Sequence, residues 1–88
     1  MIYALTYDLN ATGQDYDSLY RKINSLGVTL RPLQNLWLLD SQHSADTIRD
    51  QIRSVIDGND FVFVARLARG SYSAWMPESA HNWLEARL

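Results

Sequence analysis

The stretch that decides the fold is FVFVARLA, which occupies residues 61–68. Its β-branched and aromatic side chains are typical of a strand, and Asn59, Asp60 and Gly70 bound it with residues that favour turns. Because side chains alternate along a strand, this strand has two largely apolar faces. The two alternating sets are Phe61, Phe63, Ala65 and Leu67 on one face and Val62, Val64, Arg66 and Ala68 on the other.

Helical patterns lie on either side of this strand. Before it, apolar residues at helical spacing run from Ile48 to Ile56, where Ser44 suits the start of the helix and Gly58 its end. After it, Pro77 suits the first position of a C-terminal helix. The apolar side of that last helix is expected to carry Ala80, Trp83 and Leu84.

The first forty residues also alternate between strand-like and helix-like hydrophobic patterns. Residues 2–8 have the composition of a strand, and the polar residues 10–14 predict the turn that ends it. We expect two short strands at residues 28–31 and 36–40, the first of them at a sheet edge or broken because Pro32 lacks an N–H donor. The helical stripe that precedes them consists of Tyr16, Leu19, Tyr20, Ile23 and Leu26 and stops at Gly27.

The expected order is therefore strand, helix, strand, strand, helix, strand and a last helix. This order is typical of the ferredoxin-like (βαββαβ) arrangement. We expect an α+β fold, in which an antiparallel sheet carries two helices on one face and a C-terminal helix is added. At 88 residues, the whole chain 1–88 is expected to form a single ferredoxin-like domain.

Composition excludes several classes of function. The chain has no Cys, which excludes disulfides, thiolate metal sites and cysteine nucleophiles. A net charge of −2 excludes a strongly basic nucleic-acid coat, although not a local basic patch. No apolar run is long enough to span a membrane, and the start of the chain lacks a signal-peptide pattern. We therefore expect a cytoplasmic protein without a membrane partner.

Both faces of the predicted sheet are apolar, although two helices can cover only one of them. An exposed apolar face usually marks an interface, so we expect a homodimer. The alternative is that the C-terminal helix, with Trp83 and Leu84, closes the second face of a monomer. The side chains expected in the dimer interface are Ile2, Ala4, Thr6, Val62 and Val64.

Asp8 ends the first predicted strand, on the side of the predicted interface. Carboxylates at a sheet rim can hold Mg²⁺ or Mn²⁺, and a two-fold dimer would bring a second carboxylate to the same ion. We therefore take Asp8 as the candidate catalytic residue, and Asp8 with Asn10 as candidate ligands of Mg²⁺ or Mn²⁺. The alternative is that Asp8 caps the backbone at residues 10–11.

Arg31, Arg66 and Arg69 are candidate nucleic-acid-binding residues, because arginine forms forked hydrogen bonds with phosphates. Arg66 and Arg69 lie at the end of the last predicted strand, and Tyr72 and Trp75 follow them. Basic and aromatic side chains together bind single-stranded nucleic acids. The alternative, which the net charge favours, is that these are surface arginines that pair with carboxylates.

Several stretches together resemble a known family. They are MIYALTYDLN at residues 1–10, GQDY at 13–16, SLG at 25–27, LWLL at 36–39 and NWL at 82–84. In these stretches the chain resembles the SinR-like small proteins, which are similar to the ferredoxin-like small subunit of CRISPR spacer acquisition and, more distantly, to the virulence-associated protein D ribonucleases. The resemblance implies a homodimer in which Asp8 matches the family's metal-binding acidic residue.

Two functions remain open. Some members of the wider family are metal-dependent nucleases of RNA or DNA, which makes this chain a candidate endonuclease with Asp8 as ligand. Others are structural dimers that hold duplex DNA, which makes it a candidate non-catalytic dimeric module for a nucleic-acid or protein partner. The carboxylate at the strand end favours the first function, and the scarcity of other candidate ligands favours the second.

Overall fold

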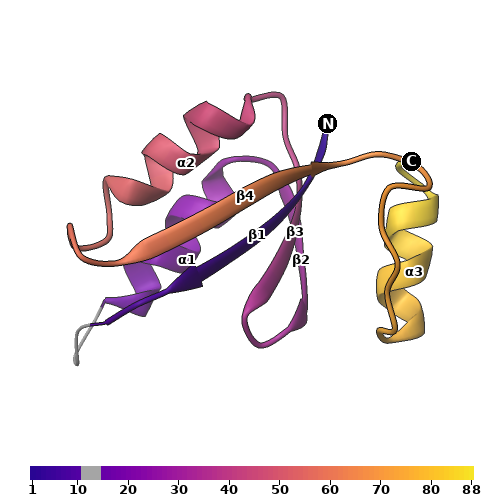
Figure 1. Cartoon of the computed structure of the whole chain (residues 1–88), viewed down its shortest axis with the longest axis horizontal. Coiled ribbons are helices and arrows are strands. Elements are labelled where there is room, and N and C mark those ends of the chain that lie inside the picture. The colour runs from indigo at the N-terminus through magenta and orange to yellow at the C-terminus, as the bar shows by residue number, and fades with distance from the viewer. Residues whose placement is uncertain (11–14) are drawn as a thin grey trace.

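A computed structural model describes residues 1–10 and 15–88, so that most of the turn predicted at 10–14 lies outside the described residues (Figure 1). In the described part of the chain, no helix is both long enough and apolar enough to cross a membrane. The elements in chain order are β1 (Ile2–Asp8), α1 (Tyr16–Ser25), β2 (Val28–Leu33), β3 (Leu36–Asp40), α2 (Ala45–Arg53), β4 (Phe61–Leu67) and α3 (Glu78–Glu85).

The strands form one antiparallel sheet in the order β2-β3-β1-β4, with β1 inside it. β1 pairs with β4 along its whole length, from Ile2 opposite Leu67 to Asp8 opposite Phe61. β2 lies at the edge, as Pro32 predicts, and its register with β3 shifts around that residue. The predicted α+β architecture is thus confirmed, and the arrangement is compatible with a ferredoxin-like fold.

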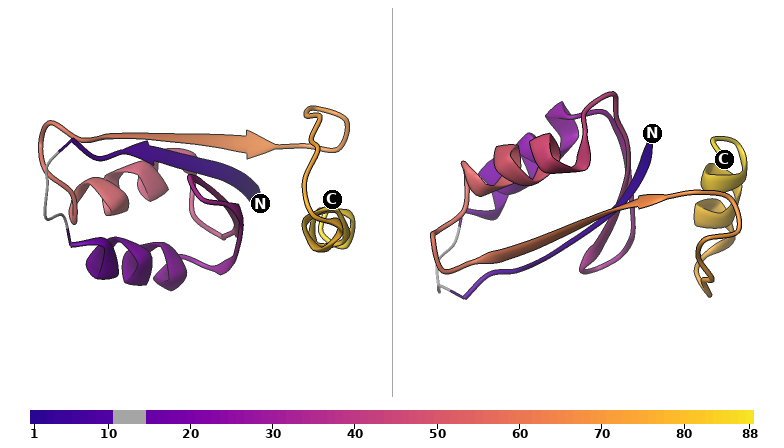
Figure 2. Two further views of the ribbon diagram at one scale, coloured as in Figure 1. Left: turned by 90° about the horizontal axis from the view of Figure 1, so that it is seen from below. Right: turned by 45° about the horizontal axis from the view of Figure 1, so that its top comes forward.

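The helices α1 and α2 lie side by side on one face of the sheet (Figure 2). Asp15 caps α1 by accepting a hydrogen bond from the Ser18 N–H at 3.0 Å, and Ser44 caps α2 by accepting one from the Thr47 N–H at 3.1 Å. Burial of apolar area between these layers is the main source of stability. The buried residues of this core are Tyr3, Leu5, Leu19, Ile23, Leu26, Trp37, Leu39, Ile48 and Ile52.

Gly27 joins α1 to β2 where a side chain would not fit. A Cβ atom at this position would lie 2.0 Å from the backbone oxygen of Asp40. Gly27 does not have a positive φ, so it is not the left-handed glycine that commonly ends a helix. The glycine predicted to stop α1 is therefore required for the close approach of two backbone segments.

α3 lies across the β2–β3 hairpin from α1 and α2 (Figure 1), over one end of the second face of the sheet. Its Leu84 is fully buried against Ile2 and Leu38, which form a small second core. The C-terminal helix thus covers part of the face that was predicted to need a cover. The partly buried residues around this second core are Leu30, Leu67, Tyr72, Met76, Trp83 and Leu88.

One expectation for α3 needs correction. Pro77 is the residue before the helix and not its first residue, because α3 begins at Glu78. Trp83 packs, partly buried, against the second core, as expected for the apolar side of the helix, and the guanidinium of Arg87 lies 4.1 Å from its ring centre. The buried side of α3 is formed by Ala80 and Leu84.

Candidate functional site

Asp8 lies at the rim of the sheet face that α1 and α2 do not cover. Its side chain is exposed, and its backbone pairs with that of Phe61. The alternative cap on residues 10–11 falls partly outside the described residues. Across residues 1–10 and 15–88, no group of three or more His, Asp or Glu side chains gathers as a metal site. Asp8 is thus not part of such a group, and a divalent cation there would need further oxygen ligands, from Asn10, the backbone or a second chain.

Asn10 follows β1 and is held by the turn that leads into β4. Its backbone N–H donates to Asp60 Oδ1 at 2.8 Å, and its Nδ2 donates to the backbone oxygen of Asn59 at 2.6 Å. Asp60 is buried and also accepts a hydrogen bond from the Asp57 N–H at 2.9 Å. Asp60 was predicted only as a turn residue, whereas its carboxylate ties the end of β1 to the start of β4.

The five side chains predicted to form a dimer interface lie on two different faces of the sheet. Ile2 packs under α3, and Ala4 and Thr6 share its side of β1. Val62 and Val64 instead pack against the core under α1 and α2. The prediction that Val62 and Val64 share a sheet face with the other three residues is therefore wrong. Both sides of β4 are apolar, so alternation alone does not tell which side meets the helices.

The β4 residues on the uncovered face are Phe61 and Phe63, whose side chains are 67% and 64% exposed. α3 lies at the other end of β4 (Figure 1), where it packs around Ile2, and Phe61 and Phe63 stay exposed. Together with Thr6 and Asp8 they line a shallow hollow of about 370 Å³. We refer to Thr6, Asp8, Phe61 and Phe63 as the open sheet patch.

The three candidate nucleic-acid-binding arginines do not form one patch. Arg69 donates to the backbone oxygen of Leu88, and Arg66 lines a pocket that also includes Leu88. Arg31 lies on β2 and lines a different pocket, beside α1. Within the described residues none of the three forms an ion pair with a side-chain carboxylate.

Arg31 is held in place by two rings and a carbonyl group. Its guanidinium carbon lies 4.9 Å from the ring centre of Tyr20 and 5.4 Å from that of Trp37. Its Nε donates to the backbone oxygen of Gln34 at 2.9 Å, and its Nη2 donates to the same atom. The rings of Tyr16, Tyr20 and Trp37 pack in series, with centres 5.8 and 5.4 Å apart. We refer to Arg31 and these three rings as the arginine–aromatic cluster.

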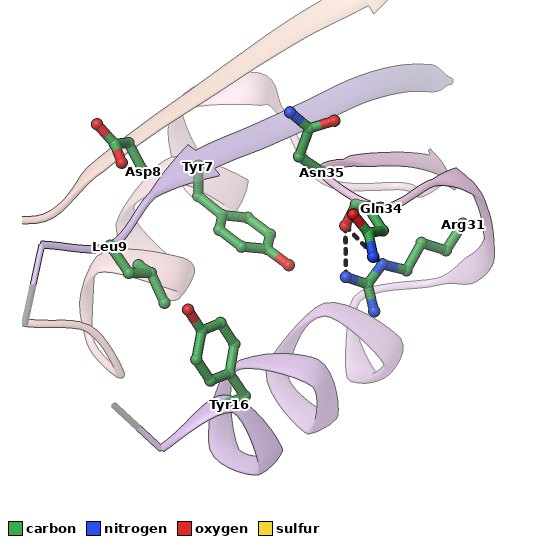
Figure 3. Close-up of a pocket in the computed structure, with 7 residues that line it drawn as sticks. All are labelled: Tyr7, Asp8, Leu9, Tyr16, Arg31, Gln34 and Asn35. Carbon is green, nitrogen blue, oxygen red and sulfur yellow. Dashed lines mark hydrogen bonds between the residues drawn. The ribbon is translucent and has the colours of Figure 1, made fainter. Parts of the chain in front are cut away.

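A polar pocket of about 490 Å³ lies beside this cluster (Figure 3). The hydroxyl groups of Tyr7, from β1, and Tyr16, from α1, lie in the space between these two elements. Tyr7 accepts a hydrogen bond from Trp37 Nε1 at 3.3 Å, and burial raises the pKa of its hydroxyl, which therefore stays protonated at neutral pH. The lining residues are Tyr7, Asp8, Leu9, Tyr16, Arg31, Gln34 and Asn35.

The pocket was not predicted, although most of its residues appear in the sequence patterns. Tyr16 belongs to the helical stripe at residues 16–26, Asp8 ends the first predicted strand, and Arg31 ends the predicted strand at residues 28–31. The buried residues of α1 are Leu19 and Ile23, whereas Tyr16 is 45% exposed. The available signal was the presence of two tyrosines in a stripe where a purely structural helix would carry aliphatic residues.

Fold and site together define a small α+β protein with an apolar sheet patch on one side and an arginine–aromatic pocket on the other. No family model matches this chain. Fold and site geometry therefore carry the functional conclusion, and kinship with the SinR-like proteins stays a proposal.

Proposed function

We propose that this chain is a small cytoplasmic nucleic-acid-binding homodimer with a ferredoxin-like fold, related to the SinR-like proteins. The observation that carries the proposal is the exposure of Phe61 and Phe63, two large rings side by side on one sheet face. Proteins that stay monomeric rarely leave such a patch uncovered. A second copy of the chain covers it, and each subunit then presents its arginine–aromatic cluster to a nucleic acid.

The open sheet patch suits a protein surface better than a nucleic acid. Its ionisable side chain is Asp8, whose negative charge repels a phosphate backbone. The hydroxyl of Thr6 donates to the backbone oxygen of Asn35 at 2.6 Å, so it is already satisfied within the chain. An apolar centre with a polar rim is the usual anatomy of a protein–protein interface.

The arginine–aromatic cluster is the part of the molecule that suits a nucleic acid. Arg31 supplies a fixed cation and Tyr16 an exposed ring, and single-stranded nucleic acids are bound by this combination. Arg66 and Arg69 add positive charge elsewhere on the chain. Because the net charge is −2, we expect this binding to be weak and sensitive to salt.

Fluorescence anisotropy of a labelled single-stranded oligonucleotide tests the proposal, with the duplex of the same sequence as comparison. Titrations between about 50 and about 200 mM salt should give a log–log slope of magnitude about 2–4, because each phosphate contact releases close to one counterion. No binding at the lowest salt would contradict the proposal. Tight binding that persists at high salt would contradict the electrostatic part of it.

A metal-dependent endonuclease is the second candidate, and the position of Asp8 favours it. Because Asp8 lies opposite Phe61 on the open sheet patch, a two-fold dimer through that patch brings two copies of the carboxylate toward one another. Paired carboxylates with Asn10 as an additional oxygen ligand suit a hard cation such as Mg²⁺ or Mn²⁺. Such an ion polarises a phosphate and activates a water molecule.

Cleavage of single-stranded RNA and duplex DNA in Mg²⁺, in Mn²⁺ and in chelator tests this second candidate. Asp8→Asn keeps the shape of the side chain but removes the charged ligand, so we expect cleavage to be lost while mass and circular dichroism stay unchanged. Asp17→Asn, at an exposed position on α1, is the matched control. Full activity in a folded Asp8→Asn protein removes Asp8 from the mechanism. An inactive wild type with both metals leaves the binding module as the function.

A further inference from the structure

We propose that the polar pocket binds one unpaired nucleotide of a single-stranded nucleic acid, with its phosphate on Arg31 and its base against Tyr16. The inference rests on the proposed nucleic-acid association and adds the place and the mode of binding. At about 490 Å³ the pocket lies within the usual size range of small-ligand sites. Its walls come from β1, α1 and the β2–β3 hairpin, three elements that the sheet and core hold in place.

Arg31 is ready to receive an anion. Its guanidinium is held over Tyr20 and Trp37 and donates twice to the backbone oxygen of Gln34. A side chain that is already ordered loses little further freedom when it binds a phosphate. No carboxylate in the described part of the chain forms an ion pair with Arg31, so its charge is not neutralised by such a partner.

The other residues that line the pocket offer the groups that a base needs. The ring of Tyr16 is 45% exposed although Tyr20 packs against it, and every base has a flat surface that stacks on such a ring. The side-chain amides of Gln34 and Asn35 each carry donors and an acceptor, which match the mixed edge of a base. The protonated hydroxyl of Tyr7 adds a further polar group, which lies between Tyr16 and Gln34 in Figure 3.

The charge of Asp8 determines the orientation of the bound nucleotide in the pocket. It lies at the end of the pocket opposite Arg31, and its carboxylate points away from the ring of Tyr7 (Figure 3). A negative charge at that end disfavours a phosphate there, whereas the guanidinium at the other end favours one. The phosphate is therefore placed at Arg31 and the base toward Tyr16, at the first residue of α1.

Titration of the whole isotope-labelled chain with uridine monophosphate tests the site, followed through its N–H signals. The reporters are the indole N–H of Trp37, which donates to Tyr7, and the Nε–H of Arg31. We expect uridine monophosphate to shift both signals. Ribose 5-phosphate and inorganic phosphate, as separate arms, should shift the Arg31 signal more than that of Trp37. A short oligouridylate should shift the same signals at lower concentration.

Two variants test the roles of the pocket walls. Arg31→Gln removes the positive charge and the guanidinium, and Tyr16→Leu removes the ring while keeping apolar bulk on α1. We expect each to weaken oligouridylate binding about tenfold, and Arg31→Gln to reduce the magnitude of the salt slope by about 0.7. Arg21→Gln, which removes an exposed charge of α1 that does not line this pocket, is the matched control and should change binding by about twofold at most.

The outcomes separate this inference from the function on which it rests. Wild-type affinity in both folded pocket variants, with shifts at other residues, overturns the nucleotide site and leaves nucleic-acid association standing. No binding of oligouridylate to the wild type overturns both. Shifts confined to the pocket and lost in Arg31→Gln support the site, whatever the oligomeric state of the chain.

Discussion

Phe63→Ala tests the open sheet patch without disturbing the core. The ring is 64% exposed, and since a phenylalanine presents about 200 Å² of accessible area, about 130 Å² is available for burial by a partner. The substitution removes about 90 Å² of that area in each subunit, which corresponds to about 2 kcal/mol. A two-fold dimer loses this contribution twice, so we expect a dimer about 4 kcal/mol less stable and a Kd about a thousandfold higher.

Sedimentation equilibrium of the wild type and the variant measures that Kd. Because most of the ring is exposed within one chain, the free energy of unfolding of the monomer should change by less than about 1 kcal/mol. Trp75→Ala is the control, since this ring is 98% exposed but lies before α3, outside the open sheet patch, and its loss should leave the Kd unchanged. A folded Phe63→Ala protein that associates as tightly as the wild type would exclude Phe63 from the dimer interface.

Three further predictions concern the single chain. Gly27→Ala places a Cβ against the backbone oxygen of Asp40, so we expect it to lower the free energy of unfolding by about 3 kcal/mol or more in a denaturant titration. Gly58→Ala is the control, because there is open space around Gly58, and it should change the free energy of unfolding by at most about 1 kcal/mol. Equal effects of the two substitutions would contradict the close approach at Gly27. Ser44→Ala removes the cap of α2 and should cost about 1 kcal/mol, and no measurable loss would show that the cap is dispensable. Because burial raises the pKa of Tyr7, its contribution to stability is complete below its unfolded pKa of about 10 and is lost as the pH rises through the folded pKa. The free energy of unfolding of Tyr7→Phe should therefore fall less above about pH 10 than that of the wild type. Parallel plots of the free energy of unfolding against pH for the two proteins would contradict the raised pKa.

The order of helices and strands follows from the sequence because the hydrophobic period changes at every element. The β-branched and aromatic runs at 2–8 and 61–67 and the helical spacing of Leu19 and Ile23 coincide with the observed strands and with α1. Pro32 correctly predicts the edge strand, since a residue without an N–H is tolerated there. These features can be predicted from the sequence because each depends on residues that are close to one another along the chain.

The face of β4 that meets the helices could not be predicted in this way. Val62 and Val64 are as apolar as Phe61 and Phe63, so the choice depends on the register with β1 and not on hydrophobicity. Burial of the valines under the helices leaves the two larger rings exposed, which is the reverse of what residue size alone favours. A pattern that is apolar on both sides predicts an interface but does not tell which residues form it.

The polar pocket also depends on contacts between distant segments. Arg31 and Tyr16 are separated along the chain, and only the packing of α1 beside β2 brings them to one cavity. In the sequence Arg31 is one surface arginine among several, and Tyr16 is one position of an apolar stripe. Their joint role follows from the tertiary arrangement and from the rings of Tyr20 and Trp37 that fix the guanidinium.

Two copies of this chain are proposed to associate through the open sheet patch, with Phe61 and Phe63 at its centre. The molar mass of the wild-type chain tests it most directly, measured by light scattering after size-exclusion chromatography at about 10 μM, because association depends on concentration. We predict twice the 10.1 kDa of a single chain. A mass of 10.1 kDa at that concentration would contradict the claim.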